Sequence, residues 1–239
     1  MNPWLGIPLE DYEGHMALPG VAQSTYLADA LEHFVNSKRV ESVAVIGCAG
    51  GNGFDRLAAA NIRRLVGVDI NSDYLAAAKR RYHSCFPDFE LVCADICSEQ
   101  CRYDPTNLAF AALIFEYVNV AASLSALRRL VHAGGYVLAI LQLPHPDIAS
   151  VTPTPFASLA RLAPVLQMVA PSEFHNVALQ AGFHIISSLP RVLSTGKAFR
   201  EILLVNTAVP ISAARLNSGT AGGARIERAF VSSKYPRIT

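Results

Sequence analysis

Short apolar runs alternate with helical patterns along most of this chain. Five runs are apolar at nearly every position, as strands buried on both faces of a sheet are, and they cover 42–46, 65–69, 89–93, 108–114 and 136–142. Between the runs, apolar residues recur at three- and four-residue spacing, for example at Leu124 and Leu127. The alternation predicts a mostly parallel sheet with helices on both of its faces.

Start and stop signals give the approximate helix boundaries. Gly134-Gly135 is expected to end the helix that contains Leu124, and Asn71-Ser72-Asp73 is expected to begin another. The predicted helices cover 21–38, 55–60 after a glycine-rich turn, a stretch starting near 72, about 121–132, and 172–182. Two further strands, 184–190 and 199–206, are joined only by a turn around Ser194–Lys197, so we expect them to be antiparallel.

Three segments lie outside the alternation. Residues 1–20 are mixed and rich in turn residues, and 144–170 are interrupted by prolines. Residues 208–239 begin with a Gly/Ser-rich stretch and hold five basic residues against one acidic residue. We therefore divide the chain into an N-terminal lid segment and helix at 1–40, a core at 41–207 and a flexible basic tail at 208–239.

The stretch Val43–Phe54, VAVIGCAGGNGF, carries the clearest chemical signal. An apolar strand stops at Gly47, and further glycines follow before a helix-forming segment. Glycine lets the backbone approach a ligand closely and tolerates positive φ. Asp69 ends the next apolar run, and a carboxylate about 20 residues after such a turn is well placed to bind ribose hydroxyls. The pattern predicts an enzyme that binds a nucleoside cofactor.

Two cofactors fit a Gly-xxx-Gly-x-Gly turn: S-adenosylmethionine and NAD(P). A short-chain NAD(P) dehydrogenase needs a Tyr-xxx-Lys pair for proton transfer, and no tyrosine here has a lysine four positions on. The Asn-Asn-Ala-Gly turn of those enzymes is also absent after the fourth strand. An NAD(P)-dependent oxidoreductase is therefore the less favoured alternative.

The segments IGCAGGNG, VGVDIN, CADI and LIFEYV resemble those of the class I S-adenosylmethionine-dependent methyltransferases, and a bacterial branch with mostly unassigned substrates in particular. The resemblance covers roughly residues 40–207. It implies a Rossmann-like methyltransferase fold with a seven-stranded, mostly parallel sheet, one antiparallel strand and helices on both faces. One departure is that Ile46, and not an acid, precedes Gly47.

The resemblance also implies a set of cofactor-binding residues. Asp69 would hold the ribose hydroxyls, and Asp95 with Ile96 would lie at the adenine edge. Glu116-Tyr117 would lie beside the transferable methyl group. The complete predicted set is Gln23, Gly47, Cys48, Ala49, Gly51, Gly53, Asp69, Ile70, Asp95, Ile96, Glu116 and Tyr117.

Methyl transfer needs little covalent help from protein, because the sulfonium already makes the methyl group electrophilic. Positioning the nucleophile in line can lower the barrier by roughly 7–11 kcal/mol, so a dedicated base is optional. The candidate catalytic residues are His15, Tyr12 and Glu116, with structural roles as the alternative for each. Gln142–His145, at the tip of the fifth strand, is a further candidate stretch. His145 in it is either a base or a structural histidine.

Composition and motifs limit the classes of partner that the protein is expected to bind. The net charge is +1, and the Asn/Asp-Pro-Pro-Tyr motif of base and amide N-methyltransferases is absent at the fourth strand, so we expect a small-molecule acceptor and no nucleic acid. The chain has no apolar run of transmembrane length and no secretory signal pattern, which predicts a cytoplasmic protein without a membrane partner. A homodimer is left open.

The five cysteines favour reduced thiols in the cytoplasm, since their number is odd. Cys93, Cys97 and Cys101 are spaced by four, which suggests a metal site at first sight. Zinc ligands usually come as two pairs, and no second pair is evident, so we predict no metal. The function predicted from the sequence is methyl transfer to a small molecule, and the alternative is a non-catalytic cofactor-binding or partner-regulating module on the same fold.

Overall fold

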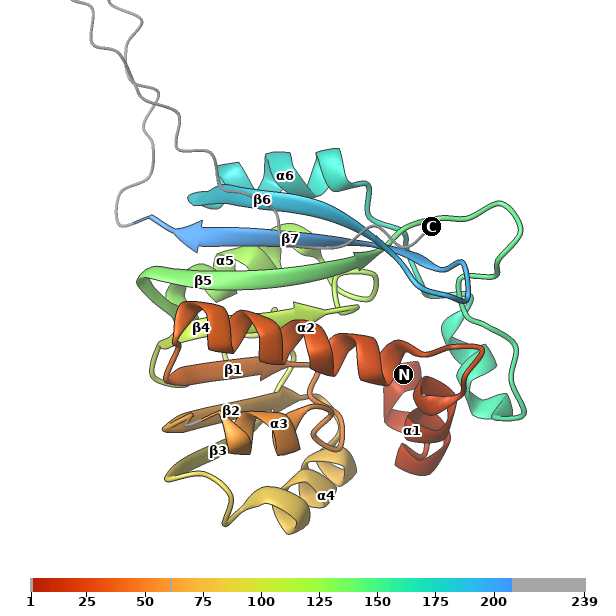
Figure 1. The fold of residues 1–239 in the computed structure, drawn as a ribbon, viewed down its shortest axis with the longest axis horizontal. Helices are drawn as coiled ribbons and strands as arrows, with labels where there is room; N and C mark the ends of the chain where they lie inside the picture. The colour runs from red at the N-terminus through yellow and green to blue at the C-terminus, as the bar shows by residue number, and fades with distance from the viewer. Residues whose placement is uncertain (1, 61, 208–239) are drawn as a thin grey trace, which may run out of the picture.

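A single seven-stranded sheet in the order β3-β2-β1-β4-β5-β7-β6 organises the protein (Figure 1). The computed structural model describes residues 2–60 and 62–207, so the predicted basic tail lies outside the described residues. The strands are β1 Ser42–Ile46, β2 Arg64–Asp69, β3 Asp88–Cys93, β4 Thr106–Ala112, β5 Val131–Gln142, β6 Phe183–Val192 and β7 Ala198–Asn206.

The strand β7 alone runs against its neighbours among the described strands. It is antiparallel to both β5 and β6, while the other neighbouring pairs are parallel. The predicted sheet, with its one reversed strand, is therefore confirmed. Because β7 is reversed, it begins at the edge where the parallel strands end, and Phe199 near its start pairs with Gln142 at the end of β5.

Helices cover both faces of the sheet. They are α1 Leu9–Ala17, α2 Gln23–Lys38, α3 Phe54–Ala59, α4 Ser72–Tyr82, α5 Val120–Leu130 and α6 Pro171–Gln180, with 3-10 turns η1 Pro3–Gly6 and η2 Ala157–Leu162. In β1, Val43 and Val45 pack in the cluster with α2 and α3, whereas Ala44 and Ile46 pack in the cluster with α5 and α6. This two-residue period explains why the central strands are apolar at every position.

Several predicted boundaries around β4 and β5 are wrong. The fourth strand ends at Ala112 and not at 114, because Leu113 turns into the left-handed region at φ 55°. The helix α5 ends at Leu130, four residues before Gly134, and β5 begins at once at Val131. Gly135 therefore lies in a strand, where a Cβ would come within 2.9 Å of the Asn107 carbonyl.

The N-terminal residues are more regular than the sequence suggested. The segment expected to be mixed and turn-rich contains η1 and the nine-residue helix α1. In Figure 1 this segment lies at the end of the sheet where the parallel strands finish, close to the part of the chain around η2. We call residues 2–17 the N-terminal segment below.

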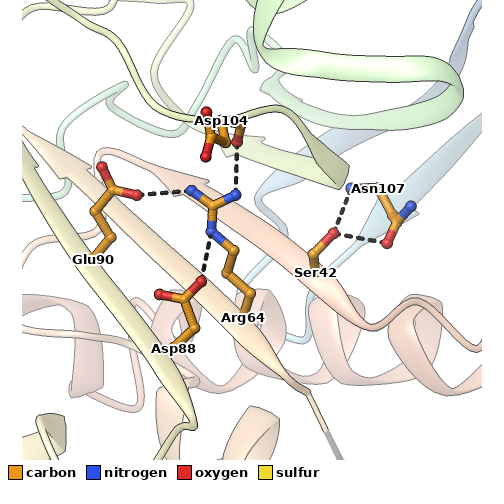
Figure 2. Close-up of polar contacts among 6 residues, drawn as sticks. All are labelled: Ser42, Arg64, Asp88, Glu90, Asp104 and Asn107. Carbon is orange, nitrogen blue, oxygen red and sulfur yellow. Dashed lines mark hydrogen bonds and ion pairs between the residues drawn. The ribbon is translucent and has the colours of Figure 1, made fainter.

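The opposite, amino edge of the sheet carries a paired network (Figure 2). Arg64, at the start of β2, donates to Glu90 Oε2 at 2.8 Å and to the Asp104 carbonyl at 3.1 Å, and its Nε lies 3.1 Å from Asp88 Oδ2. Nearby, the Ser42 hydroxyl donates to Asn107 Oδ1 at 2.7 Å and accepts from the Asn107 N–H at 2.9 Å. The starts of β1, β2, β3 and β4 are thereby joined.

Candidate functional site

The glycine turn after β1 is held directly against Asp69 at the end of β2. Oδ2 of Asp69 accepts a hydrogen bond from the Ala49 N–H at 2.9 Å, and Oδ1 accepts one from the Asn71 N–H at 2.9 Å. Gly47 has φ 71°, which favours glycine there. A carboxylate has about four acceptor sites, so Asp69 keeps capacity for hydroxyl donors from a ligand. Burial raises the pKa of Asp69, and the backbone N–H groups oppose that shift.

A cavity of about 370 Å³ opens above this turn and extends along the carboxyl edge of the sheet. Its volume lies within the range of roughly 300–1,000 Å³ that is usual for small-ligand pockets. The β2 end of the cavity is lined by Gly47, Ala49, Asp69, Ile70, Asp95 and Ile96. The end nearest β5 and β7, which we call the β7 end, is lined by Gln142, Ser150, Val151 and Lys197. Glu116 and Tyr117, which follow β4, line the cavity between these ends.

The N-terminal segment forms one wall of this cavity. Trp4, Tyr12, His15 and Met16 all line it. The Trp4 ring makes edge-to-face contacts with Tyr12, at a centroid distance of 5.7 Å, and with Tyr117, at 5.1 Å. Leu159 and Leu162 of η2 belong to the same apolar cluster as Trp4 and Tyr12. The two segments outside the regular alternation therefore meet over the cavity.

Hydrogen bonds attach the N-terminal segment to α4 and to Asn71, which caps that helix. The Tyr74 hydroxyl donates to the Ile7 carbonyl at 2.8 Å, and Asn71 Nδ2 donates to the Trp4 carbonyl at 3.1 Å. Ser158, in η2, holds the other side by donating to Asp11 Oδ2 at 2.6 Å. The segment is therefore fixed on two sides of the cavity.

Arg81 links α1 to the glycine turn. Its guanidinium makes two hydrogen bonds to the Glu13 carboxylate, at 2.5 and 3.0 Å, and donates to the Gly50 carbonyl at 3.1 Å. A Cβ at Gly50 would lie 2.4 Å from Glu13 Oε1 and 2.9 Å from Leu9 Cδ2. A larger residue would not fit at position 50, because α1 packs directly on Gly50.

Glu116 is the most deeply buried acid of the cavity wall, with 2% of its surface exposed. Oε1 accepts from the Gln142 N–H at 2.6 Å, whereas Oε2 has no hydrogen-bond partner. Burial raises the pKa of Glu116 to about 7, although the hydrogen bond from Gln142 opposes the shift. A carboxyl group with a pKa near neutrality can give up or accept a proton during a reaction at physiological pH.

Lys197 brings a buried cation to the β7 end. It lies in the turn before β7, only 4% exposed, and Nζ donates to the Ser150 carbonyl at 2.9 Å. Gln142 Nε2 donates to the same carbonyl at 2.8 Å. Burial lowers the pKa of Lys197 to about 8. Lys197 makes no ion pair with a carboxylate within residues 2–60 and 62–207.

His15 and Tyr12 face the cavity from α1. His15 Nδ1 lies 3.0 Å from the Thr154 hydroxyl, and burial, together with the positive charge of Lys197, lowers the pKa of His15. For Tyr12, burial raises the phenol pKa above its ordinary value, and the negative charge of Asp69 adds to the effect. A neutral His15 can accept a proton, whereas Tyr12 keeps its own at physiological pH.

The structure places most of the predicted site residues on the cavity wall. Eleven of them line it, namely Tyr12, His15, Gln23, Gly47, Ala49, Asp69, Ile70, Asp95, Ile96, Glu116 and Tyr117. Asp95 also accepts from the Cys97 N–H at 2.8 Å, so it stabilises its own turn as well.

Three predicted cofactor residues lie outside the cavity wall. Cys48 is buried, and a Cβ at Gly67 would come within 3.0 Å of its sulfur, so its side chain packs toward β2. Gly51 and Gly53 have φ of 96° and 80° and pack against Tyr82 and Ala28, so their structural role is close packing. His145 is exposed, does not line the cavity, and accepts from the Asp147 N–H at 3.1 Å.

The cysteines form no cluster of metal ligands. Cys93 is exposed and donates toward the Ile70 carbonyl, Cys97 is half-buried, and Cys101 is buried. Within the described part of the chain, no three histidine, cysteine or acidic side chains are grouped as a metal site would need. The metal-free state stays a prediction.

Sequence reasoning did not single out several residues of the cavity wall, among them Trp4, Tyr74 and Lys197. Tyr74 was assigned only to a helix, and Lys197 only to a turn. A signal for Lys197 exists in the predicted antiparallel hairpin, because a reversed final strand must begin at the carboxyl edge of its parallel neighbours. Trp4 carried no comparable signal.

Comparison with known proteins agrees with this geometry. Residues 43–135 match the family described as methyltransferase domain. No curated protein matches the sequence. The magnesium protoporphyrin IX methyltransferase ChlM from Synechocystis PCC 6803, solved with bound S-adenosylhomocysteine, has a TM-score of 0.60 at 11% identity over 78% of this chain and 84% of that chain.

Two other solved structures extend the comparison. The N-methyltransferase NodS from Bradyrhizobium japonicum WM9, in complex with S-adenosylhomocysteine, has a TM-score of 0.57 at 14% identity over 80% of this chain and 89% of its own. The [4+2]-cyclase SpnF has a TM-score of 0.58 at 13% identity over 75% of this chain and 81% of its own. The fold is therefore that of the class I S-adenosylmethionine-dependent methyltransferases.

None of the helices within residues 2–60 and 62–207 is both long and apolar enough to cross a bilayer.

Proposed function

We propose, from a sheet and a matched region that are both those of class I methyltransferases, that this protein transfers a methyl group from S-adenosylmethionine to a small-molecule acceptor. The observation that carries the proposal is the contact between the glycine turn and Asp69 on the cavity floor, where the Ala49 N–H bonds to Oδ2 at 2.9 Å. This contact supports Asp69 as the carboxylate that would bind the ribose, because it lies beside a backbone that a ligand can approach closely.

The lining of the β2 end supports the roles that the resemblance implies. Asp69 would hold the ribose hydroxyls, and Asp95 and Ile96 would border the adenine. The resemblance gives the loop under the methionine portion to Gly47, Gly51 and Gly53, of which Gly47 lines the cavity. Gln23, Ile70 and Tyr117 complete this wall. When bound, the cofactor would supply an electrophilic methyl group, and the protein would hold the acceptor in line and exclude water.

Glu116 is the residue we propose as the base. Glu116 lines the cavity, its Oε2 is buried without a hydrogen-bond partner, and its pKa of about 7 suits proton removal from an acceptor near neutral pH. His15 is the weaker candidate, because burial and the charge of Lys197 lower its pKa and its Nδ1 lies 3.0 Å from the Thr154 hydroxyl. We assign Tyr12 to binding, since its raised phenol pKa keeps it protonated.

The N-terminal segment acts, in this proposal, as a lid joined to the core of residues 41–207. Its contacts with α4 and η2 support a wall that keeps water from the reacting atoms. A cavity of about 370 Å³ supports a small molecule as acceptor. The five free cysteines support a cytoplasmic location.

The decisive experiment is calorimetry with S-adenosylhomocysteine and NADP⁺. We expect the first to bind and the second not to bind. Asp69→Ala should weaken S-adenosylhomocysteine binding by about 1.5–3 kcal/mol for each charge-assisted hydrogen bond lost. Asp55→Ala, an exposed acid in the helix after the same turn that does not line the cavity, is the matched control and should bind normally.

Binding without methyl transfer is the alternative, and the likeness to a protein described as a cyclase is the observation behind it. Incubating the protein with methyl-labelled S-adenosylmethionine and a metabolite extract separates the two. Label appearing in an extract component supports methyl transfer. Tight S-adenosylhomocysteine binding with no labelled product from any extract would favour the non-catalytic module.

A further inference from the structure

Lys197 reaches the cavity because β7 is reversed. The residue lies just before Ala198, and the Ala198 carbonyl accepts from the Leu143 N–H at 2.8 Å, directly after β5 ends. A strand that ran parallel to β5 would place its first residues at the opposite edge of the sheet. The fold therefore brings a cation to the edge where Glu116 and Gln142 also lie.

The ammonium group of Lys197 is incompletely satisfied. It has three donors, and the Ser150 carbonyl accepts one of them at 2.9 Å. Nearby polar groups are the Gln142 amide, which bonds to that same carbonyl, and His15, which supplies no negative charge. Burying a cation without an anionic partner costs several kcal/mol, so this lysine lowers the stability of the folded protein.

Apolar side chains, including two from the N-terminal segment, line much of the rest of the cavity. They are Trp4, Met16, Tyr117, Val151, Leu159 and Leu162. A ligand at this end would therefore place an apolar body against these residues and present one polar group to the ammonium. An anionic group would supply the missing partner of Lys197.

Hydrogen bonds connect Glu116 to Lys197 through Gln142. The Gln142 N–H donates to Glu116 Oε1 at 2.6 Å, and Gln142 Nε2 donates to the Ser150 carbonyl that also accepts from Lys197 Nζ. The acid and the cation therefore lie on the two sides of Gln142, so one small molecule can place its nucleophile near Glu116 and its anionic group near Lys197.

We propose that the β7 end of the cavity binds an acceptor that carries a carboxylate on a small apolar or aromatic body, with the carboxylate ion-paired to Lys197. This inference rests on the proposed function, since it names the class of molecule to be methylated. It assigns Lys197 to substrate recognition and leaves proton removal to Glu116. No charge is left unpaired at the β7 end once the acid is bound.

The test compares 4-hydroxybenzoate with 4-hydroxybenzamide, which differ in the charge of one group. Binding of each is measured by calorimetry, with and without S-adenosylhomocysteine. We expect the acid to bind the native protein more tightly by about tenfold, which is about 1.4 kcal/mol. In Lys197→Met, which keeps the length of the side chain, the ratio should fall to about one.

Lys79→Met is the matched control, because Lys79 is exposed on α4 and does not line the cavity, and it should keep the native ratio. Equal affinities for acid and amide in the native protein, absence of acid binding, or an unchanged ratio in Lys197→Met would each overturn the carboxylate site. S-adenosylhomocysteine is titrated separately into all three proteins. Failure of that titration refutes the proposed function, whereas a normal titration with no preference for the acid refutes only this inference.

Discussion

At the amino edge of the sheet, the Arg64 guanidinium meets two carboxylates and a carbonyl, whereas at the carboxyl edge Glu116 and Lys197 are buried with no oppositely charged partner among the described residues. Both edges belong to the same sheet. The carboxylates that meet Arg64 are also partly exposed, with side chains 60% and 39% accessible.

The contrast separates charges that stabilise from charges that destabilise. A partly exposed, paired network contributes modestly to stability, and its charges are already paired without a ligand. A buried acid or cation without a partner lowers stability, and such groups are typical of sites where a ligand or a reaction supplies what is missing. The amino edge is therefore a structural brace, and the carboxyl edge is where function is to be sought.

Removing the N-terminal segment should expose the buried charges of the carboxyl edge and so remove the contrast with the amino edge. Of the changes considered, it should have the largest effect on binding and turnover. Deleting residues 2–17 takes away one wall of the cavity but no strand, so the sheet should stay folded. We expect S-adenosylhomocysteine affinity to fall by about tenfold or more, or about 1.4 kcal/mol, and turnover to be lost. Water would reach Glu116, and its pKa should fall from about 7 toward 4.5, as measured by carbon NMR.

Leu5→Ala is the control for this deletion. Leu5 belongs to the same segment but is 51% exposed and does not line the cavity, so affinity and turnover should be unchanged. A deletion variant that binds S-adenosylhomocysteine normally and turns over at the full rate would contradict the lid. A Glu116 pKa that stays near 7 after the deletion would show that the segment does not keep water from this acid.

Glu116→Gln should improve stability while removing activity. The folded acid has its pKa raised from 4.5 to about 7, so between these pH values the unfolded chain ionises while the folded protein keeps its proton. The native protein therefore loses up to about 3 kcal/mol as pH rises from 4.5 to 7, and the loss persists above 7. The variant avoids this loss, so urea unfolding should show it to be more stable at pH 8 and nearly equal to the native protein at pH 4.

The same variant should lower turnover by about 10²- to 10⁴-fold, because Gln cannot accept the proton. Glu173→Gln is the control: this acid lies exposed in the first turn of α6, and its stability change should stay within about 0.5 kcal/mol at either pH. Equal stability of Glu116→Gln and the native protein at pH 8 would mean that the acid is ionised at little cost. A fully active variant would remove Glu116 as the base.

The strands were predicted well because burial on both faces leaves an unambiguous sequence pattern. The wrong boundaries lie where a local signal competed with a tertiary one. Gly134-Gly135 looks like the end of a helix, yet strand pairing beside Asn107 requires a glycine there and the helix stops at Leu130. The helix α1 was missed because Leu9–Ala17 contains few apolar residues and is held largely by contacts to α4 and η2.

The β2 end of the cavity was predictable because its residues follow strands in a fixed order. Gly47, Asp69 and Asp95 come directly after β1, β2 and β3, and the carboxyl edge collects them. At the β7 end the same rule selected Gln142, which lines the cavity. Lys197 and Trp4 were not predicted, because Lys197 precedes its strand and Trp4 comes from a segment far away in sequence. Such positions depend on strand reversal and on the packing of the N-terminal segment.

Breaking the amino-edge brace should affect stability alone, and by the smallest amount of these changes. Arg64→Met keeps the apolar part of the side chain and removes two ion pairs and the hydrogen bond to the Asp104 carbonyl. Partly exposed pairs contribute about 0.2–1 kcal/mol each, so urea unfolding should show a loss of about 1–2 kcal/mol. High salt should shrink the difference, because screening already weakens the pairs in the native protein.

Arg63→Met provides a matched control one residue away. Arg63 is 78% exposed and its nearest acid, Glu41, lies 3.9 Å away, so its loss should change stability by less than about 0.5 kcal/mol. S-adenosylhomocysteine affinity should be unchanged in both variants, since neither arginine lines the cavity. If Arg64→Met weakened that affinity while Arg63→Met did not, the two edges would be energetically coupled, and the division between a structural edge and a functional edge would have to be abandoned.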